Sequence, residues 1–227
     1  MSFFNWAWDW VTTDANWHGS GSIPQQLVAH LGYSALPFLI AALIGVPVGV
    51  AIGHRGGKGA VVVINIGNAW RAIPTLGLLI LLAVFLGFSA LTWLLPLVVL
   101  AIPPILINAA AGVAGVDPGV RDAATGVGMT TWQQILRVEV PIAVPLILLG
   151  LRTSAIFVVA TATIAAYIGL GGLGRFIFDG LASNEYGPVA GGALLVVVLA
   201  ILVLLLFAGL TRLATPAGLR QQAKSQQ

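Results

Sequence analysis

The side chains that could do chemistry are gathered in one polar stretch, residues 115–141. The chain has 10 basic and 7 acidic residues, and five of them lie in this stretch: Asp117, Arg121, Asp122, Arg137 and Glu139. Carboxylates and guanidinium groups at these spacings can cap helices and form ion pairs, within the chain or with another protein. The chain has no cysteine, and its three histidines are scattered: His18, His30 and His54. We therefore expect no metal site and no catalytic residue, and the stretch favours a binding surface instead.

The first part of this stretch predicts a short helix. Asp117 can cap it, and Pro118 suits its first position because the missing N–H has no partner there in any case. Gly126 and Gly128 can end the helix or let the backbone turn sharply.

The second part predicts another short helix. Thr130 or Thr131 can cap it, and it continues through Val138. Pro141 marks where the following membrane helix begins. A loop that only joins two membrane helices needs no such structure, so the pattern indicates a docking site for a soluble partner.

The stretch resembles the coupling loop, often called the EAA loop, of permease subunits in bacterial ABC importers. The family pattern is Glu-Ala-Ala, three residues, Gly, nine residues and Ile-x-Leu-Pro. This chain has the same spacing, with Asp for Glu and Val for Ile and Leu. The resemblance implies that six residues couple the chain to an ATP-hydrolysing subunit: Asp122, Ala123, Ala124, Gly128, Val138 and Pro141. An ordinary inter-helix loop is the alternative.

Composition predicts an all-α polytopic membrane protein. Hydrophobic residues make up 59% of the chain and charged residues 7%, with a mean hydropathy of +1.01, whereas soluble domains carry about 25% charged residues. About 20 apolar residues cross a bilayer. Five spans are predicted: 27–52, 60–88, 90–112, 142–167 and 189–210. They belong to a transmembrane domain, residues 23–213, between a Trp-rich interfacial segment, residues 1–22, and a cytoplasmic tail, residues 214–227. A disordered N-terminal tail is the alternative to the interfacial segment.

The distribution of basic residues predicts the orientation. With the N-terminus outside and the C-terminus inside, seven basic residues fall on the inner side: Arg55, Lys58, Arg121, Arg137, Arg212, Arg220 and Lys224. The outer segments hold Arg175 as their one basic residue. This is the positive-inside pattern, and it places the coupling loop in the cytoplasm, where ATP is.

Polar residues inside the predicted spans are candidates for the translocation pathway. They are Asn65, Asn68, Asn108, Thr161, Thr163 and Tyr167, and each could instead stabilise contacts between helices. Arg71 and Arg152 could face the pathway or extend to the inner interface. The predicted spans contain no Asp or Glu, which argues against an ion-driven carrier.

A glycine-rich run follows the fourth predicted span. Gly169, Gly171 and Gly174 satisfy G-x-G-x-x-G, but this motif binds dinucleotides only between a strand and a helix of a soluble βαβ unit. We expect a close-packed turn or a re-entrant segment instead. The run ATATIAAYIGLGG, residues 160–172, resembles permeases that import the osmoprotectants glycine betaine, carnitine and choline, and less closely methionine permeases. The resemblance covers residues 31–210.

These resemblances imply a non-catalytic permease subunit with the type I fold of the methionine importer. No Walker A motif is present, so ATP hydrolysis with Mg²⁺ is expected on a partner ATPase, and this chain is expected to bind no cofactor. The implied partners are a second, identical or homologous permease, two ATP-binding subunits, an external substrate-binding protein and the lipid of the plasma membrane, with no nucleic acid. A permease for methionine or another small solute is one alternative. An ion-driven carrier or a membrane scaffold without transport activity is another.

Overall fold

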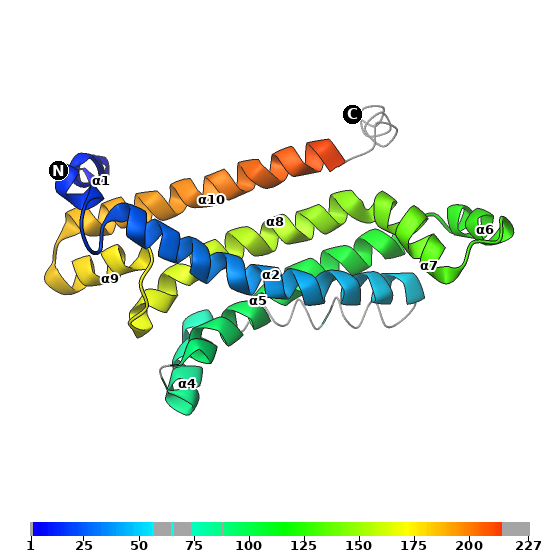
Figure 1. The fold of residues 1–227 in the computed structure, drawn as a ribbon, viewed down its shortest axis with the longest axis horizontal. Helices are drawn as coiled ribbons and strands as arrows, with labels where there is room; N and C mark the ends of the chain where they lie inside the picture. The colour runs from blue at the N-terminus through cyan, green and yellow to red at the C-terminus, as the bar shows by residue number, and fades with distance from the viewer. Residues whose placement is uncertain (1, 57–64, 66–73, 88, 215–227) are drawn as a thin grey trace. The chain divides into compact units, whose positions relative to one another are not determined.

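The structure is a computed structural model that describes residues 2–56, 65, 74–87 and 89–214 (Figure 1). Throughout this described part the regular structure is helical. The α-helices are α1 (Phe3–Thr12), α2 (Ile23–Arg55), α4 (Thr75–Leu86), α5 (Ala90–Ala114), α6 (Pro118–Gly126), α7 (Thr131–Gln134), α8 (Val140–Ala165), α9 (Gly174–Ser183) and α10 (Tyr186–Ala214). Two 3-10 turns, Asp14–Trp17 and Ala166–Ile168, and a π-helical segment, Ile135–Glu139, complete the helical elements.

Four helical stretches of the described part are long and apolar enough to cross a membrane: Ile23–Arg55, Ala90–Ala114, Thr131–Ile168 and Tyr186–Ala214. They contain the first, third, fourth and fifth predicted spans and extend beyond them. About half of the second predicted span, 60–88, lies outside the described residues, and Asn68 and Arg71 are among the residues not described. Apart from Asn65 and Pro74, its described part is the short apolar helix α4, followed by Gly87 with φ +66°.

The prediction that a new helix begins at Pro141 was wrong. The helix that starts at Thr131 continues without a break through the π-helical segment and Pro141 into α8. Proline lacks an N–H and its ring collides with the carbonyl four residues earlier in a regular α-helix. A wider π-turn just before Pro141, in which the Val140 N–H donates to the Ile135 carbonyl, avoids this collision. The second predicted helix therefore does not end at Val138.

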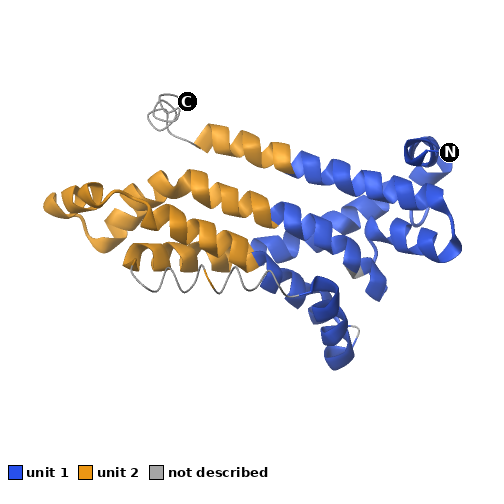
Figure 2. Cartoon of the chain, turned by 180° about the vertical axis from the view of Figure 1, so that it is seen from behind, with its two compact units in different colours: residues 1–40, 73–101, 155–203 blue, residues 41–72, 102–154, 204–227 orange. Residues whose placement is uncertain are grey.

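The chain divides into two compact units (Figure 2). Unit 1 comprises residues 1–40, 73–101 and 155–203, and its core includes Val159, Leu173 and Leu199. The Trp-rich segment is ordered and packs against α9 and α10. Trp6 stacks on Tyr186 with ring centroids 5.1 Å apart, and Trp10 contacts Phe176 at 4.8 Å. In the structure the N-terminal residues therefore belong to this unit.

Unit 2 comprises residues 41–72, 102–154 and 204–227. Its core, which includes Val50, Val113 and Ile147, joins the C-terminal half of α2 to α5 and α8. Small residues let these helices approach closely. A Cβ placed on Gly53 would lie 2.5 Å from the Ala110 carbonyl oxygen, and one on Gly150 would lie 2.8 Å from the Pro104 carbonyl oxygen. The three helices thus meet at backbone distance next to the polar loop.

Candidate functional site

The segment between α5 and α8 begins with the helix predicted from Asp117. Oδ1 of Asp117 accepts a hydrogen bond from the Gly119 N–H at 2.7 Å, and Pro118 occupies the first turn of α6. The helix ends at Gly126, and Gly128 has φ +79°, a conformation that glycine adopts without strain. The predicted cap, first residue and turn are all confirmed.

The second helix of the segment is capped by Thr130. Thr130 Oγ1 accepts from the Gln133 N–H, and Oε1 of Gln133 accepts from the Thr130 N–H at 2.9 Å, which together form a capping box. Gln134 Nε2 donates to Thr125 Oγ1 at 2.6 Å and so links α7 to α6. These contacts give the loop a defined shape between α5 and α8, where Figure 1 shows α6 and α7.

The six residues predicted to couple the chain to a partner do not have equal exposure. Asp122, Ala123 and Gly128 are exposed, and Val138 and Pro141 are partly exposed. Ala124 is buried, with 6% of its surface accessible. Ala124 is therefore packed inside the chain, whereas the exposed residues can meet a partner.

Large apolar side chains on the same loop were not singled out from the sequence. Val127, Trp132 and Leu136 are 74%, 71% and 60% exposed. Within the described part of the chain, no other residue covers these three side chains. Exposed aromatic and aliphatic side chains on an ordered loop are typical of a protein interface. The signal was present in the sequence as Trp132, an aromatic residue two positions after the capping Thr130.

A buried ion cluster lies where the loop meets α2, and sequence reasoning missed it. The Glu139 side chain is 1% exposed. Its Oε2 accepts a hydrogen bond from Nδ1 of His54, the next-to-last residue of α2, at 2.8 Å. Its Oε1 lies 3.1 Å from Nε of Arg121, at an angle outside that of a hydrogen bond, so this contact is an ion pair.

The same guanidinium reaches α5. Nη2 of Arg121 donates to the Val113 carbonyl at 2.5 Å. Because a carboxylate only accepts hydrogen bonds, His54 carries its proton on Nδ1 in this contact. The histidine could not be connected with Glu139 from spacing, since 85 residues separate the two in the chain.

The predicted pathway residues fall in different parts of the fold. Asn65 is exposed and Asn108 donates to the Pro104 carbonyl at 2.7 Å, both within unit 2. Thr161, Thr163 and Tyr167 belong to unit 1, where Thr161 is buried and Thr163 donates to the Ala160 carbonyl. Asn68 and Arg71 lie outside the described residues. Arg152 is partly exposed on α8.

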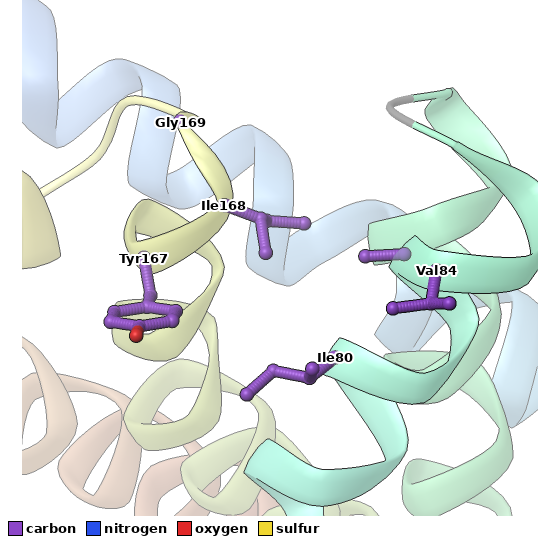
Figure 3. Close-up of a pocket in the computed structure, with 6 residues that line it drawn as sticks. Ile80, Val84, Tyr167, Ile168 and Gly169 are labelled. Carbon is purple, nitrogen blue, oxygen red and sulfur yellow. The ribbon is translucent and has the colours of Figure 1, made fainter.

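Tyr167 borders a pocket of unit 1. The pocket has a volume of about 600 Å³ and is lined by Ile80, Ala83, Val84, Tyr167, Ile168 and Gly169. Figure 3 shows Ile80 and Val84 on α4 facing Ile168 across the pocket, with the tyrosine ring beside it. Tyr167 is 58% exposed, and its ring meets Phe178 edge-on with centroids 5.6 Å apart. This arrangement presents one aromatic ring to a largely apolar hollow.

The glycine-rich run forms a close-packed turn between α8 and α9. Gly169 and Gly172 have φ +84° and +93°, and a Cβ on Gly174 would lie 2.1 Å from the Thr163 carbonyl oxygen. Oε1 of Gln26 accepts from the Gly172 N–H at 2.6 Å, which ties the turn to α2. The run follows a helix rather than a strand, and of the two forms expected the structure contains the close-packed turn.

Comparison with known proteins places these features in a family. A family described as the binding-protein-dependent transport system inner membrane component matches residues 45–216. The glycine betaine/carnitine/choline transport system permease protein OpuCB of Bacillus subtilis is 39% identical over 88% of this chain and 92% of that protein. The choline transport system permease protein OpuBB of the same organism is 36% identical over 88% and 92%. The carnitine transport permease protein OpuCB of Listeria monocytogenes is 39% identical over 86% and 89%.

A solved structure shows the same fold. A chain of the inward-facing MetNI methionine ABC transporter superposes with a TM-score of 0.72 and 24% identity, over 86% of this chain and 96% of that chain. The fold is therefore that of a type I ABC permease, as predicted. The matched region includes the whole loop between α5 and α8. From the family match, the relatives and the shared fold together, the chain belongs to the binding-protein-dependent transport system inner membrane components, a family of multi-pass transport permeases.

Proposed function

We propose that the chain is the permease subunit of an ATP-driven importer for osmoprotectants such as glycine betaine, carnitine or choline. The three relatives described above carry these solutes in their names and match almost the whole chain. The single observation that carries the mechanism is the capped, ordered loop between α5 and α8, which exposes Val127, Trp132 and Leu136. In this proposal the loop docks into a groove of a cytoplasmic ATPase.

The proposed assembly contains two permeases, identical or homologous, two ATP-binding subunits and an external binding protein. ATP and Mg²⁺ would be held by the ATPase, and this chain would bind no cofactor itself. The N-terminus would lie outside and the C-terminus inside, which puts the loop on the ATPase side. ATP-driven closure of the ATPases would displace the two loops and switch the pathway from inward-facing to outward-facing.

The pocket beside Tyr167 supports a role for this residue in the pathway. Quaternary ammonium groups bind to aromatic faces through cation–π attraction, and the exposed ring of Tyr167 borders a hollow of about 600 Å³. Selectivity would lie mainly in the binding protein, since a pathway must release the solute it admits. Thr163, Asn65, Asn108, Thr161 and Arg152 remain candidates for the pathway or its inner edge.

The experiment is uptake of labelled glycine betaine at high osmolarity in a deletion strain that carries the wild-type gene or Gly128→Asp. A Cβ on Gly128 meets nothing within 4 Å, so the added carboxylate would project from the loop toward the partner. Gly19→Asp is the matched control, because Gly19 has φ +82° and equally open surroundings but lies in the N-terminal segment. Rescue by the wild type and Gly19→Asp, but not by Gly128→Asp, supports both substrate and loop.

Two other outcomes would change the proposal. Rescue by Gly128→Asp as well would show that the loop is not the coupling element. Failure of the wild type to rescue would contradict the osmoprotectant assignment, and competition between methionine and other small solutes on the purified binding protein would then identify the substrate. The fold shared with the methionine transporter is the observation that favours this second candidate.

A further inference from the structure

The buried carboxylate of Glu139 connects four helical elements in unit 2. Glu139 ends the π-helical segment that leads into α8, and its two partners are His54 at the end of α2 and Arg121 on α6. Arg121 in turn donates to the Val113 carbonyl, near the end of α5. Through Arg121 and Glu139, α6 is thus connected to the ends of α2 and α5 and to the beginning of α8.

The three long helices that meet at this cluster are themselves packed at backbone distance. A Cβ on Gly49 would lie 2.7 Å from both the Ala109 Cβ and the Leu106 carbonyl oxygen. A Cβ on Gly112 would lie 3.0 Å from the Leu146 Cβ, between α5 and α8. Close-packed interiors shift as units rather than deforming continuously. Within unit 2, these parts of α2, α5 and α8 form one block. A movement of α6 can reach this block only through a contact between the two.

We propose that Glu139, Arg121 and His54 form a charge clamp that makes α6 and this three-helix block move as one body when a partner displaces the loop. The inference rests on the proposed function, because it assigns the route by which the ATPase drives the permease. Glu139 is a positioning residue in this scheme: it touches neither the solute nor ATP.

Burial of the cluster fits transmission better than simple stabilisation. A buried ion pair adds little net stability over apolar side chains of the same volume, because desolvation offsets the attraction. Losing one partner is nonetheless strongly unfavourable, since the remaining charge is left buried. Such a contact resists separation without adding to overall stability, which is what a connection between moving parts requires.

The test is the number of solute molecules imported per ATP hydrolysed, measured on the complete complex in liposomes. Glu139→Gln keeps the shape of the side chain and removes its charge. We expect the ratio to fall about tenfold, in the usual range of coupling between two sites, while the ATPase still copurifies with the permease. A stability defect alone would reduce import and ATP hydrolysis together and leave their ratio unchanged.

Two sets of variants serve as controls. Asp179→Asn removes an ion pair of similar length, 2.9 Å, between Asp179 and Arg175 of unit 1. These two side chains are 67% and 57% exposed, so the number of solute molecules imported per ATP should stay at the wild-type value. His54→Asn keeps a nitrogen donor near the position of Nδ1 and should retain coupling, whereas His54→Ala should lose it. A wild-type ratio in both Glu139→Gln and His54→Ala would overturn the clamp.

A second readout needs no transport. The natural chain has no cysteine, so labels can be placed at Arg55→Cys, at the exposed end of α2, and at Val120→Cys on α6, which is 40% exposed. The clamp predicts one narrow distance distribution in the purified permease and a broad one after Glu139→Gln. An equally narrow distribution in both would refute it. Absence of glycine betaine import by the wild-type complex would instead contradict the proposed function, and the label distances would still decide the clamp.

Discussion

Replacing Gly53 by alanine tests whether the contact between α2 and α5 is as close as the structure shows. The added Cβ would lie 2.5 Å from the Ala110 carbonyl oxygen and 2.8 Å from the Val113 Cβ. Neither neighbour can rotate away, because one is a backbone atom and the other is fixed directly to the backbone. The helices must therefore separate by roughly an ångström to restore ordinary contact distances of about 3.5 Å.

The cost can be isolated with a second alanine on the same helix. Gly32 also lies in α2, but a Cβ there meets nothing within 4 Å. Both substitutions gain about 0.5–1 kcal/mol from the better helix propensity of alanine, so this contribution cancels in the comparison. Overpacking a tight contact costs about 1–3 kcal/mol, and the short distance to a carbonyl oxygen places Gly53→Ala in the upper part of that range. We expect Gly53→Ala to be less stable than Gly32→Ala by about 2–3 kcal/mol.

The assay is thermal unfolding of the purified permease in lipid nanodiscs. For a chain of this length, each kcal/mol corresponds to roughly 2–4 °C, so the two variants should differ by about 4–12 °C. Uptake should fall in Gly53→Ala as well, because separation of α2 from α5 also displaces the adjacent His54 from Glu139. Equal melting temperatures for the two variants would show that the glycine contact does not set the spacing of these helices.

Two further predictions concern the loop and the pocket. Trp132→Ala should weaken association with the ATPase about tenfold or more, because large exposed aromatic side chains dominate protein interfaces. Co-sedimentation of the permease with the ATPase measures this affinity. Trp8→Ala is the control, because it removes a side chain of similar exposure (68%) from α1 and should leave the affinity unchanged. Tyr167→Phe should keep glycine betaine uptake, whereas Tyr167→Ala should reduce it about 2- to 30-fold, because cation–π attraction of roughly 0.5–2 kcal/mol needs the ring and not the hydroxyl. Loss of uptake in Tyr167→Phe would place the effect on the hydroxyl group instead.

Local signals in the sequence were sufficient for the loop. The cap at Asp117, the turn at Gly128 and the cap at Thr130 each depend on contacts within a few residues, and the structure contains all three. The error at Pro141 also has a local physical cause. Proline usually marks a helix boundary, but one turn of π-helix accommodates it, and the residues that adopt this turn carry no distinctive sequence pattern.

The contacts that sequence reasoning missed are those between distant segments. His54 was considered as one of three scattered histidines, and nothing in its sequence neighbourhood indicates that Glu139 lies 2.8 Å away. Gln26 and Gly172 are a similar case, joined by a hydrogen bond across 146 positions. Hydrophobic periodicity predicts that such helices exist, but it does not predict which faces meet, because packing in membranes depends on small residues and polar contacts on both partners.

The position of Glu139 bears on what drives transport. All seven acidic residues lie in the described part of the chain, and Glu139 alone among them is buried. A carboxylate that binds a coupling ion must be able to exchange its partner for that ion. Glu139 instead contacts two basic side chains of its own chain, His54 and Arg121, and lies at the end of the segment that leads into α8. The charge is therefore used to connect helices rather than to carry an ion. The position of Glu139 agrees with transport that is driven by an external source of energy acting through the loop.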